Sequence, residues 1–246
     1  GSPIATGASN GVSAVVSTTA GNRRVRLTAT GSTDVIFDSG EFVLPGGERL
    51  LLHVKPYFGP GTNTATVGII STARTSSFPA QQLPVQLRVA NAIADLPATD
   101  VQITNSASPS EIQGLTVNSI SEPVILDQGA TQIDVTLETD PGSVIVTNSS
   151  ELPGGERRTL IAAGNFSNNT ATSRLAVDPQ RPISTAAQIN FMHGSVSAGR
   201  VDAYLLTGDA TIAGSAASVA NLALLANTNL QVPAGTYSLV FTANGA

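Results

Sequence analysis

The side chains in this 246-residue sequence that are best suited to catalysis are two histidines and a scatter of carboxylates. His193 stands beside Ser195 and Ser197 in the segment HGSVSAG, a spacing that raises the question of a histidine-activated serine. The nucleophile elbow of serine hydrolases requires G-x-S-x-G, which this segment lacks. The alternation of the preceding AQINFM turns His193 toward the interior, and its counterpart in an internal repeat is Asn91, which cannot act as a general base. We therefore predict no catalytic residue and expect Asn91 and His193 to be hydrogen-bonded structural side chains.

The sequence also lacks the ligand patterns of metal and cofactor sites. It contains no cysteine, which excludes thiolate zinc sites, and its other histidine, His53, has no acidic neighbour to orient it. Asp100 and Asp202 occupy matching positions that we place on solvent-facing strand surfaces, and no calcium-loop or nucleotide-loop motif occurs. No metal and no cofactor are predicted. A pair of carboxylates distant in sequence, as in glycosidases, is the remote hydrolase alternative.

The best candidate for ligand binding is the segment VKPYFGPG at residues 54–61. Tyr57 lies in a proline-bracketed loop, where an exposed ring can stack on a sugar or anchor a protein partner. Phe58 has a counterpart in Phe166, so we expect Phe58 to fill a core position even though it belongs to the same candidate site. The alternative is a loop tyrosine packed on its own domain.

Composition limits the class of partner. The net charge is −5 and the pI is about 4.9, so no basic surface is available to gather phosphates, and nucleic acid is not expected as a partner. No stretch approaches the roughly 20 apolar residues that cross a bilayer. Only 12% of residues are charged while 41% are hydrophobic, a balance that favours packed β-structure over disorder.

The hexapeptide LPGGER occurs twice, at residues 44–49 and again at 152–157. Proline presets φ near −65° and glycine accepts a positive φ, which together are the requirements of a type II turn. We therefore predict a turn with Pro45 and Gly46 at its two central positions, and an equivalent turn at Pro153 and Gly154. The repeated hexapeptide is interpreted as structural.

The segments around the two hexapeptides also repeat. The matching pairs are 23–37 with 131–145, 83–104 with 185–206, and 126–138 with 232–244. Their apolar residues alternate with the period of half-buried strands, separated by Gly, Pro, Asn and Asp turns, and only 215–227 has a helical pattern. A recurring unit of about 100 residues made of short strands is typical of an immunoglobulin-like β-sandwich. The predicted fold is all-β, with tandem immunoglobulin-like repeats.

The repeats are unequal in extent. We expect a partial repeat at 1–82 that lacks the opening strands, a complete repeat at 83–183, and a partial repeat at 184–246 that lacks the closing strands. The two ends are thus nearly complementary halves of one unit. Strand edges left without a neighbour are templates for pairing. The halves can complete each other within one chain or between chains, or the sequence is part of a longer array.

Three segments resemble a known family. These segments are QLRVANAIADLPATDVQIT (86–104), INFMHGSVSAGRVDAYLLT (189–207) and VPAGTYSLVF (232–241). They are similar to the bacterial repeats called domain of unknown function 4397. The resemblance implies a secreted, periplasmic or surface-anchored β-sandwich array in bacteria, with no family-wide activity established.

The sequence therefore predicts a non-enzymatic secreted or cell-surface protein with a structural, adhesive or spacer role. Its expected partners are other copies of itself, through the terminal half-units, or cell-surface and matrix components. The alternative is a carbohydrate- or protein-binding module that uses Tyr57 and Phe58.

Overall fold

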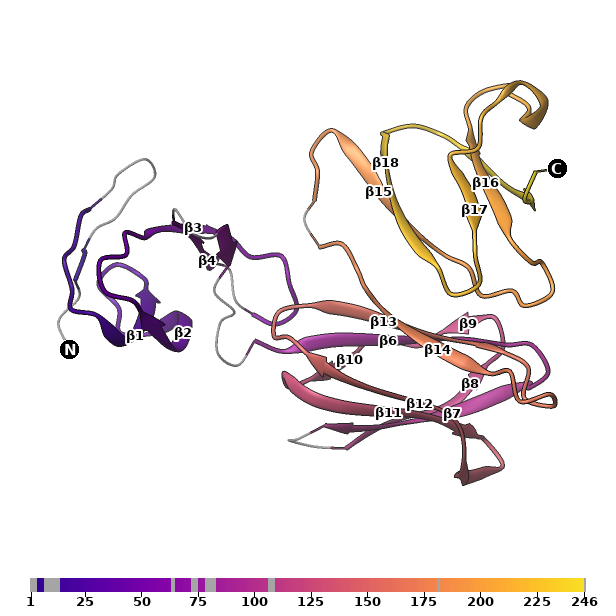
Figure 1. The fold of residues 1–246 in the computed structure, drawn as a ribbon, viewed down its shortest axis with the longest axis horizontal. Coiled ribbons are helices and arrows are strands. Elements are labelled where there is room, and N and C mark those ends of the chain that lie inside the picture. Colours follow the sequence, from indigo (N-terminus) through magenta and orange to yellow (C-terminus); the bar gives the residue numbers. More distant parts are fainter. Residues whose placement is uncertain are drawn as a thin grey trace. The chain divides into compact units, whose positions relative to one another are not determined.

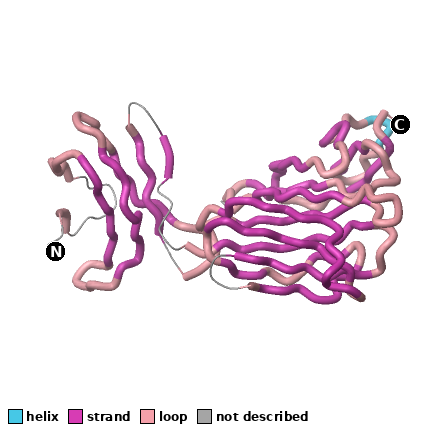
Figure 2. Tube along the Cα trace, turned by 60° about the horizontal axis from the view of Figure 1, so that its bottom comes forward, coloured by secondary structure: helices cyan, strands magenta, loops and turns pink. Residues whose placement is uncertain are grey.

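The structure is a computed structural model, and among its described residues every regular element is a β-strand apart from one 3₁₀ turn, Ile212–Gly214. Figure 2 shows this turn near the C-terminus and strands over most of the remaining trace. The all-β prediction is confirmed, and the described part of the chain has no helix that is long and apolar enough to cross a membrane. The structure describes residues 4–6, 14–62, 65–71, 75–77, 83–105, 109–180 and 182–245.

The chain forms two compact units, Gly1–Leu83 and Pro84–Ala246. In the first unit, one sheet pairs β1 (Gly21–Thr28) with β2 (Val35–Leu44). A second sheet has the order β3 (Leu51–Pro56), β4 (Ala65–Ile70) and β5 (Thr75–Ser77), all antiparallel. The buried side chains shared by these sheets are Phe37, Val67, Ile69 and Leu83.

The second unit begins with two sheets packed face to face, which together are called the sandwich below (Figure 1). One sheet has the order β10-β6-β13-β14, with β9 also paired to β6, and the other has the order β12-β11-β7-β8. The strand bounds are β6 Val85–Ile93, β7 Ala98–Asn105, β8 Ser110–Thr116, β9 Ser119–Ile120, β10 Val124–Leu126, β11 Gly129–Leu137, β12 Asp140–Leu152, β13 Arg157–Gly164 and β14 Thr172–Val177. Alternating residues of both sheets form one closed core that includes Leu87, Val89, Val101, Ile133 and Leu160.

Most strand pairs here are antiparallel, but β6 and β13 run parallel at the centre of their sheet. Their register places Arg157 opposite Gln86 and Leu160 opposite Val89. A parallel pair cannot be joined by a tight hairpin, so the chain between them passes through the other sheet before it returns. This pairing of sequence-distant strands closes the core.

The repeated hexapeptide forms the corner at which the chain changes sheets. The second copy links β12 to β13, and the first copy links β2 to β3. A turn is present in both copies, but the predicted position of the positive φ is wrong: it lies at Gly47 (+75°) and Gly155 (+86°), one residue after Gly46 and Gly154. Either member of a Gly-Gly pair can adopt a positive φ, so the sequence alone does not decide between them.

The rest of the second unit has five strands in two small sheets. Strands β15 (Ala186–Met192) and β18 (Asn227–Pro233) form one pair. The other sheet has the order β17 (Val219–Leu222), β16 (Val201–Leu206) and β19 (Ser238–Ala243). The buried residues of the hydrophobic cluster that these strands form are Phe191, Val201, Ala203 and Leu222.

The helical pattern at 215–227 did not produce a helix. The segment contains β17, and its backbone is interrupted by positive φ values at Asn221 (59°) and Leu225 (59°). The Ser218 N–H donates to Ala203 O at 2.8 Å and the Leu205 N–H donates to Ser218 Oγ at 3.0 Å, so the segment is bound to β16. Tertiary pairing overrides the weak helical periodicity.

Strand registers recur between the parts of the chain that match in sequence. In the sandwich, Gly129 lies opposite Leu152 and Ile133 lies opposite Ile103. The sequence-matched residues pair in the same way: Gly21 lies opposite Leu44, and Leu239 lies opposite Leu205. The corresponding pairs therefore carry the same strand neighbours in different parts of the chain.

Candidate functional site

The two candidate binding aromatics lie differently from each other. Tyr57 is half-buried against the core of the first unit, and its hydroxyl donates to Pro60 O at 2.9 Å. Phe58 is 44% exposed, as is its counterpart Phe166 at 42%, so the expectation that Phe58 fills a core position is wrong. In this proline-bracketed loop, Phe58 faces solvent and Tyr57 packs against the core. The alternation of buried and exposed residues along a strand does not continue into the loop.

Asn91 and His193 are both buried and hydrogen-bonded. Asn91 Nδ2 donates to Leu115 O at 2.8 Å, and its Oδ1 accepts from the Ile93 N–H at 3.1 Å. His193 Nε2 lies 2.6 Å from Gly199 O. A carbonyl only accepts, so Nε2 carries the proton in this contact.

The same tautomer of His193 leaves Nδ1 as an acceptor, and the Ser195 N–H points at it from 3.4 Å. The hydroxyl of Ser195 instead lies 3.4 Å from that of Ser197. Both ring nitrogens are thus engaged with backbone groups, and the arrangement holds the loop that follows β15 rather than activating a serine.

His53 is engaged by packing. It lies opposite Gly68 in the β3–β4 pair, and a Cβ added to Gly68 would come within 2.2 Å of His53 Nε2. Only a glycine leaves room for the ring at this position. The described residues contain no group of three or more His, Cys, Asp and Glu side chains that could hold a metal ion.

Asp100 and Asp202 are buried, so their predicted placement on solvent-facing surfaces is wrong. Asp202 accepts from the Asn221 N–H at 2.6 Å, Asn244 Nδ2 at 2.9 Å and the Gly245 N–H at 3.0 Å. These donors, the Gly245 N–H first, lower the pKa of Asp202 below its usual range.

The Asp100 carboxylate likewise binds backbone: it accepts a hydrogen bond from the Gly114 N–H at 2.8 Å. Asp100 lies in β7, and Asp202 lies in the matching strand β16. Each carboxylate accepts hydrogen bonds from neighbouring backbone N–H groups that would otherwise lack acceptors. Their repetition in both sequence copies was the signal for this structural role, because a solvated residue has no reason to recur in register.

Asp95 fixes the loop at one end of the sandwich. Its carboxylate accepts from the Phe166 N–H at 2.7 Å and the Ser167 N–H at 2.8 Å. Hydrogen bonds from Ser167 and Phe166, the Ser167 side chain first, lower the pKa of Asp95 to about 2. The sequence-matched position after β15 is Ser197, so this carboxylate clamp is particular to the sandwich.

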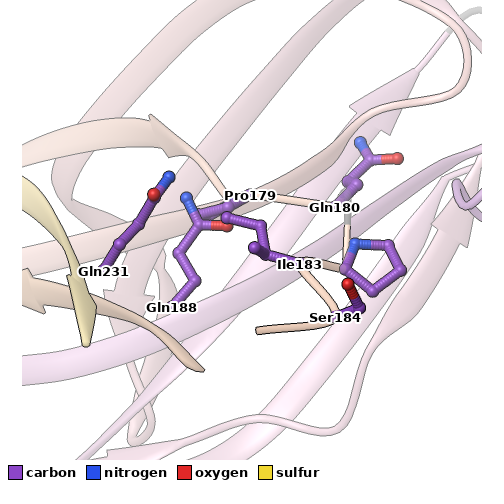
Figure 3. Close-up of a pocket in the computed structure, with 7 residues that line it drawn as sticks. Pro179, Gln180, Ile183, Ser184, Gln188 and Gln231 are labelled. Atoms are coloured by element: carbon purple, nitrogen blue, oxygen red, sulfur yellow. The ribbon is translucent and has the colours of Figure 1, made fainter. Parts of the chain in front are cut away.

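A shallow cleft of about 630 Å³ lies where the chain leaves the sandwich for β15 (Figure 3). Gln188 and Gln231 are opposite each other on β15 and β18, and their amides project side by side into it. The described lining has amide and hydroxyl groups but no charged side chain, which suits neutral polar groups such as a peptide backbone. The lining residues are Pro179, Gln180, Pro182, Ile183, Ser184, Gln188 and Gln231.

Strands β3 and β15 each have one edge without a neighbour among the described strands. Strand β3 pairs with β4 on one side alone, and β15 pairs with β18 on one side alone. Their sequence counterparts in the sandwich, β13 and β6, pair with each other through those same edges. By this comparison, the open edge of β3 corresponds to the edge of β13 that pairs with β6, and the open edge of β15 corresponds to the edge of β6 that pairs with β13.

Exposed apolar side chains occupy core-facing positions in β3 and in β19, which is the edge strand of the β17-β16-β19 sheet. In β3, Leu52 is 39% and Val54 is 62% exposed, whereas the matching Leu160 and Ala162 of β13 are both 0% exposed. In β19, Leu239 is 49% and Phe241 is 53% exposed.

The sandwich positions that match Leu239 and Phe241 are Ile133 and Val135, at 0% and 1% exposed. Monomeric proteins rarely leave several large apolar side chains exposed together, and such groups mark interaction surfaces. The strongest candidate site among the described residues is therefore the set of open sheet edges, together with the uncovered core-facing positions of β3 and β19.

The fold and these edges define an all-β protein with one closed sandwich and flanking strands whose cores are open. Residues 85–204, from β6 into β16, match the family model described as a domain of unknown function (DUF4397). The resemblance predicted from the sequence is confirmed. A search of the curated proteins gave no match.

Proposed function

We propose that this chain is a non-enzymatic, bacterial secreted or cell-surface protein with a structural, adhesive or spacer role, which assembles through its terminal parts. The observation that carries the proposal is the exposure of core-facing residues beside unpaired strand edges at both ends of the described chain. Burying one large apolar side chain contributes about 1.5–3 kcal/mol, so several of them provide a driving force for association.

The proposal includes tandem immunoglobulin-like repeats, divided as 1–82, 83–183 and 184–246. Its support is the recurrence of strand registers between matching segments. The pairs Thr159–Ala176 of the sandwich and Leu51–Ile70 of the first unit correspond in sequence and in pairing. A two-layer unit of about 100 residues with short strands is the expected form of such a repeat.

The absence of enzymatic activity is part of the proposal, and its support is the use of the polar candidates. Asn91, His193, Asp100 and Asp202 hold backbone groups in place. Each has its hydrogen-bonding capacity directed into the fold, and catalytic groups require reach to a substrate. The extracellular location rests on the family resemblance and on the composition.

Light scattering on a sizing column over a hundredfold range of concentration tests the assembly. We expect the mass to grow above the 24.9 kDa of one chain as concentration rises. Replacing the two exposed core-position residues of β19, Leu239 and Phe241, with threonine should reduce that growth, while the same change at the exposed loop residue Phe58 should not. A mass of one chain throughout the range would contradict the proposal.

A carbohydrate- or protein-binding module is the second candidate, favoured by the exposure of Phe58. Phe58→Ala should abolish retention on a glycan array or on bacterial cells, whereas Tyr57→Phe, which keeps the half-buried ring and removes the hydroxyl that donates to Pro60 O, should not. Equal binding by both variants and the parent chain would exclude this site.

A further inference from the structure

We infer that β3 of one copy of the chain pairs in parallel with β15 of a second copy, in the register that β13 and β6 use in the sandwich. The inference rests on the proposed assembly and specifies its strands, its direction and its register.

The sandwich supplies the template. The β13–β6 pair runs from Arg157 opposite Gln86 to Gly164 opposite Ile93. The corner before β13 adds two backbone hydrogen bonds, from the Gly155 N–H to Pro84 O and from the Gln86 N–H to Glu156 O, both 3.0 Å. The corner and the strand therefore act together as one docking element for a β6-like strand.

The first unit repeats this docking element. Its corner has the same six residues, and its Gly47 has a positive φ, as Gly155 does. Strand β3 also pairs on one side with β4, which matches β14 in sequence. Leu52 and Val54 occupy the core-facing positions that Leu160 and Ala162 fill in β13, yet they are exposed. The docking element is present, and no β6-like strand pairs with it among the described strands.

Strand β15 has the features of the accepted strand. Gln188 and Phe191 match Gln86 and Val89 of β6 in sequence, and β15 holds a β10-like neighbour, β18, in the corresponding register: Ile189 lies opposite Leu230 as Leu87 lies opposite Val124. Its other edge has no partner in the described chain.

Superimposing the template gives the register of the pair. Arg49 lies opposite Gln188, Leu52 opposite Phe191, and Val54 opposite His193. Leu52 and Val54 gain the apolar cover that they lack.

A second copy of the chain is the occupant because it carries the complementary edge. Each copy offers one β3 edge and one β15 edge, so the contact is head-to-tail and does not close on itself as a two-fold dimer does. The expected product is a series of open chains that lengthens with concentration.

Disulfide trapping tests the register. Because the sequence has no native cysteine, only the introduced cysteines can form a disulfide. Arg49→Cys and Gln188→Cys are prepared as two separate proteins, both at exposed positions, and are mixed under mild oxidation. We expect a disulfide-linked species of two chains, formed at least tenfold faster than in a mixture of Arg49→Cys with Asn190→Cys, which is two residues out of register. Circular dichroism checks that each variant is folded.

Three results would overturn the inference. The matched and mismatched mixtures can react equally, neither can react, or the matched pair can react only when both substitutions are in one chain, which would place the pairing within a molecule. If light scattering still shows growth in mass in those cases, assembly stands and uses other surfaces. Failure of the proposed function would instead remove the growth itself.

Discussion

Strands β13 and β3 carry related sequences in different surroundings. Both follow the same LPGGER corner and both pair antiparallel with the next strand. Strand β13 also has β6 on its other edge, and Leu160 is fully buried, while β3 has no second neighbour among the described strands and Leu52 is exposed. The comparison shows that local sequence sets which side of a strand faces the core, whereas burial depends on a partner from elsewhere in the chain.

Truncation at these two matching positions should show the largest difference. Leu160→Ala removes a fully buried side chain and should lower the free energy of unfolding by about 2–5 kcal/mol. Leu52→Ala, in dilute protein, should cost under about 1 kcal/mol because its side chain is partly in water already. Urea unfolding followed by circular dichroism measures both, and equal losses would break the comparison.

The next largest effect is expected where the segment that follows β15 packs closely on β6 and β13. A Cβ on Gly194 would lie 2.8 Å from Ala92 Cβ and 2.9 Å from Ile161 Cδ1. Gly194→Ala should therefore destabilise the second unit by about 1–3 kcal/mol through overpacking. Gly214→Ala is the control, since nothing lies within 4 Å of its added Cβ, and thermal unfolding should separate the two variants.

The corner can be tested one glycine at a time. Gly47→Ala places a side chain at φ +75° and should cost about 1–2 kcal/mol, although nothing lies within 4 Å of the new Cβ. Gly46→Ala should be close to neutral, because Gly46 lacks a positive φ and the nearest atom is 3.8 Å away. A lower melting temperature for Gly46→Ala than for Gly47→Ala would instead support a positive φ at Gly46, as the sequence predicted.

The smallest effect concerns acid stability of the sandwich loop. The pKa of Asp95 is lowered to about 2, against about 3.9 in an unfolded chain, so its stabilising contribution is complete above pH 4. That contribution is lost as the pH falls from about 4 to 2. Asp95→Asn should remove this part of the pH dependence, so the melting temperatures of parent and variant should converge toward pH 2.

Much of the fold followed from alternation and turn chemistry. The strand periods around Val25 and Ile133 predicted the β-structure, and the repeated Pro-Gly-Gly predicted the corners. These rules could not predict which strands pair, because a period of two residues shows which side chains face the core but does not identify the neighbouring strand.

The candidate site followed less well. The burial of Asp100 and Asp202 depends on backbone donors many residues away, such as Gly114 and Gly245, and a single sequence does not place these donors. The sequence predicted a buried Phe58 and an exposed Tyr57 as the binding candidate, whereas Phe58 is exposed and Tyr57 packs against the core. This difference depends on the geometry of the loop, which a single sequence does not give.

Amide hydrogen exchange at two protein concentrations tests the central claim most directly. In dilute protein, backbone amides at 49–56 and 187–193 should exchange faster than those at 157–164 and 86–93. Raising the concentration a hundredfold should protect the first two segments together and leave the last two unchanged. Slow exchange at 49–56 and 187–193 in dilute protein, or growth in mass without any new protection there, would contradict the account.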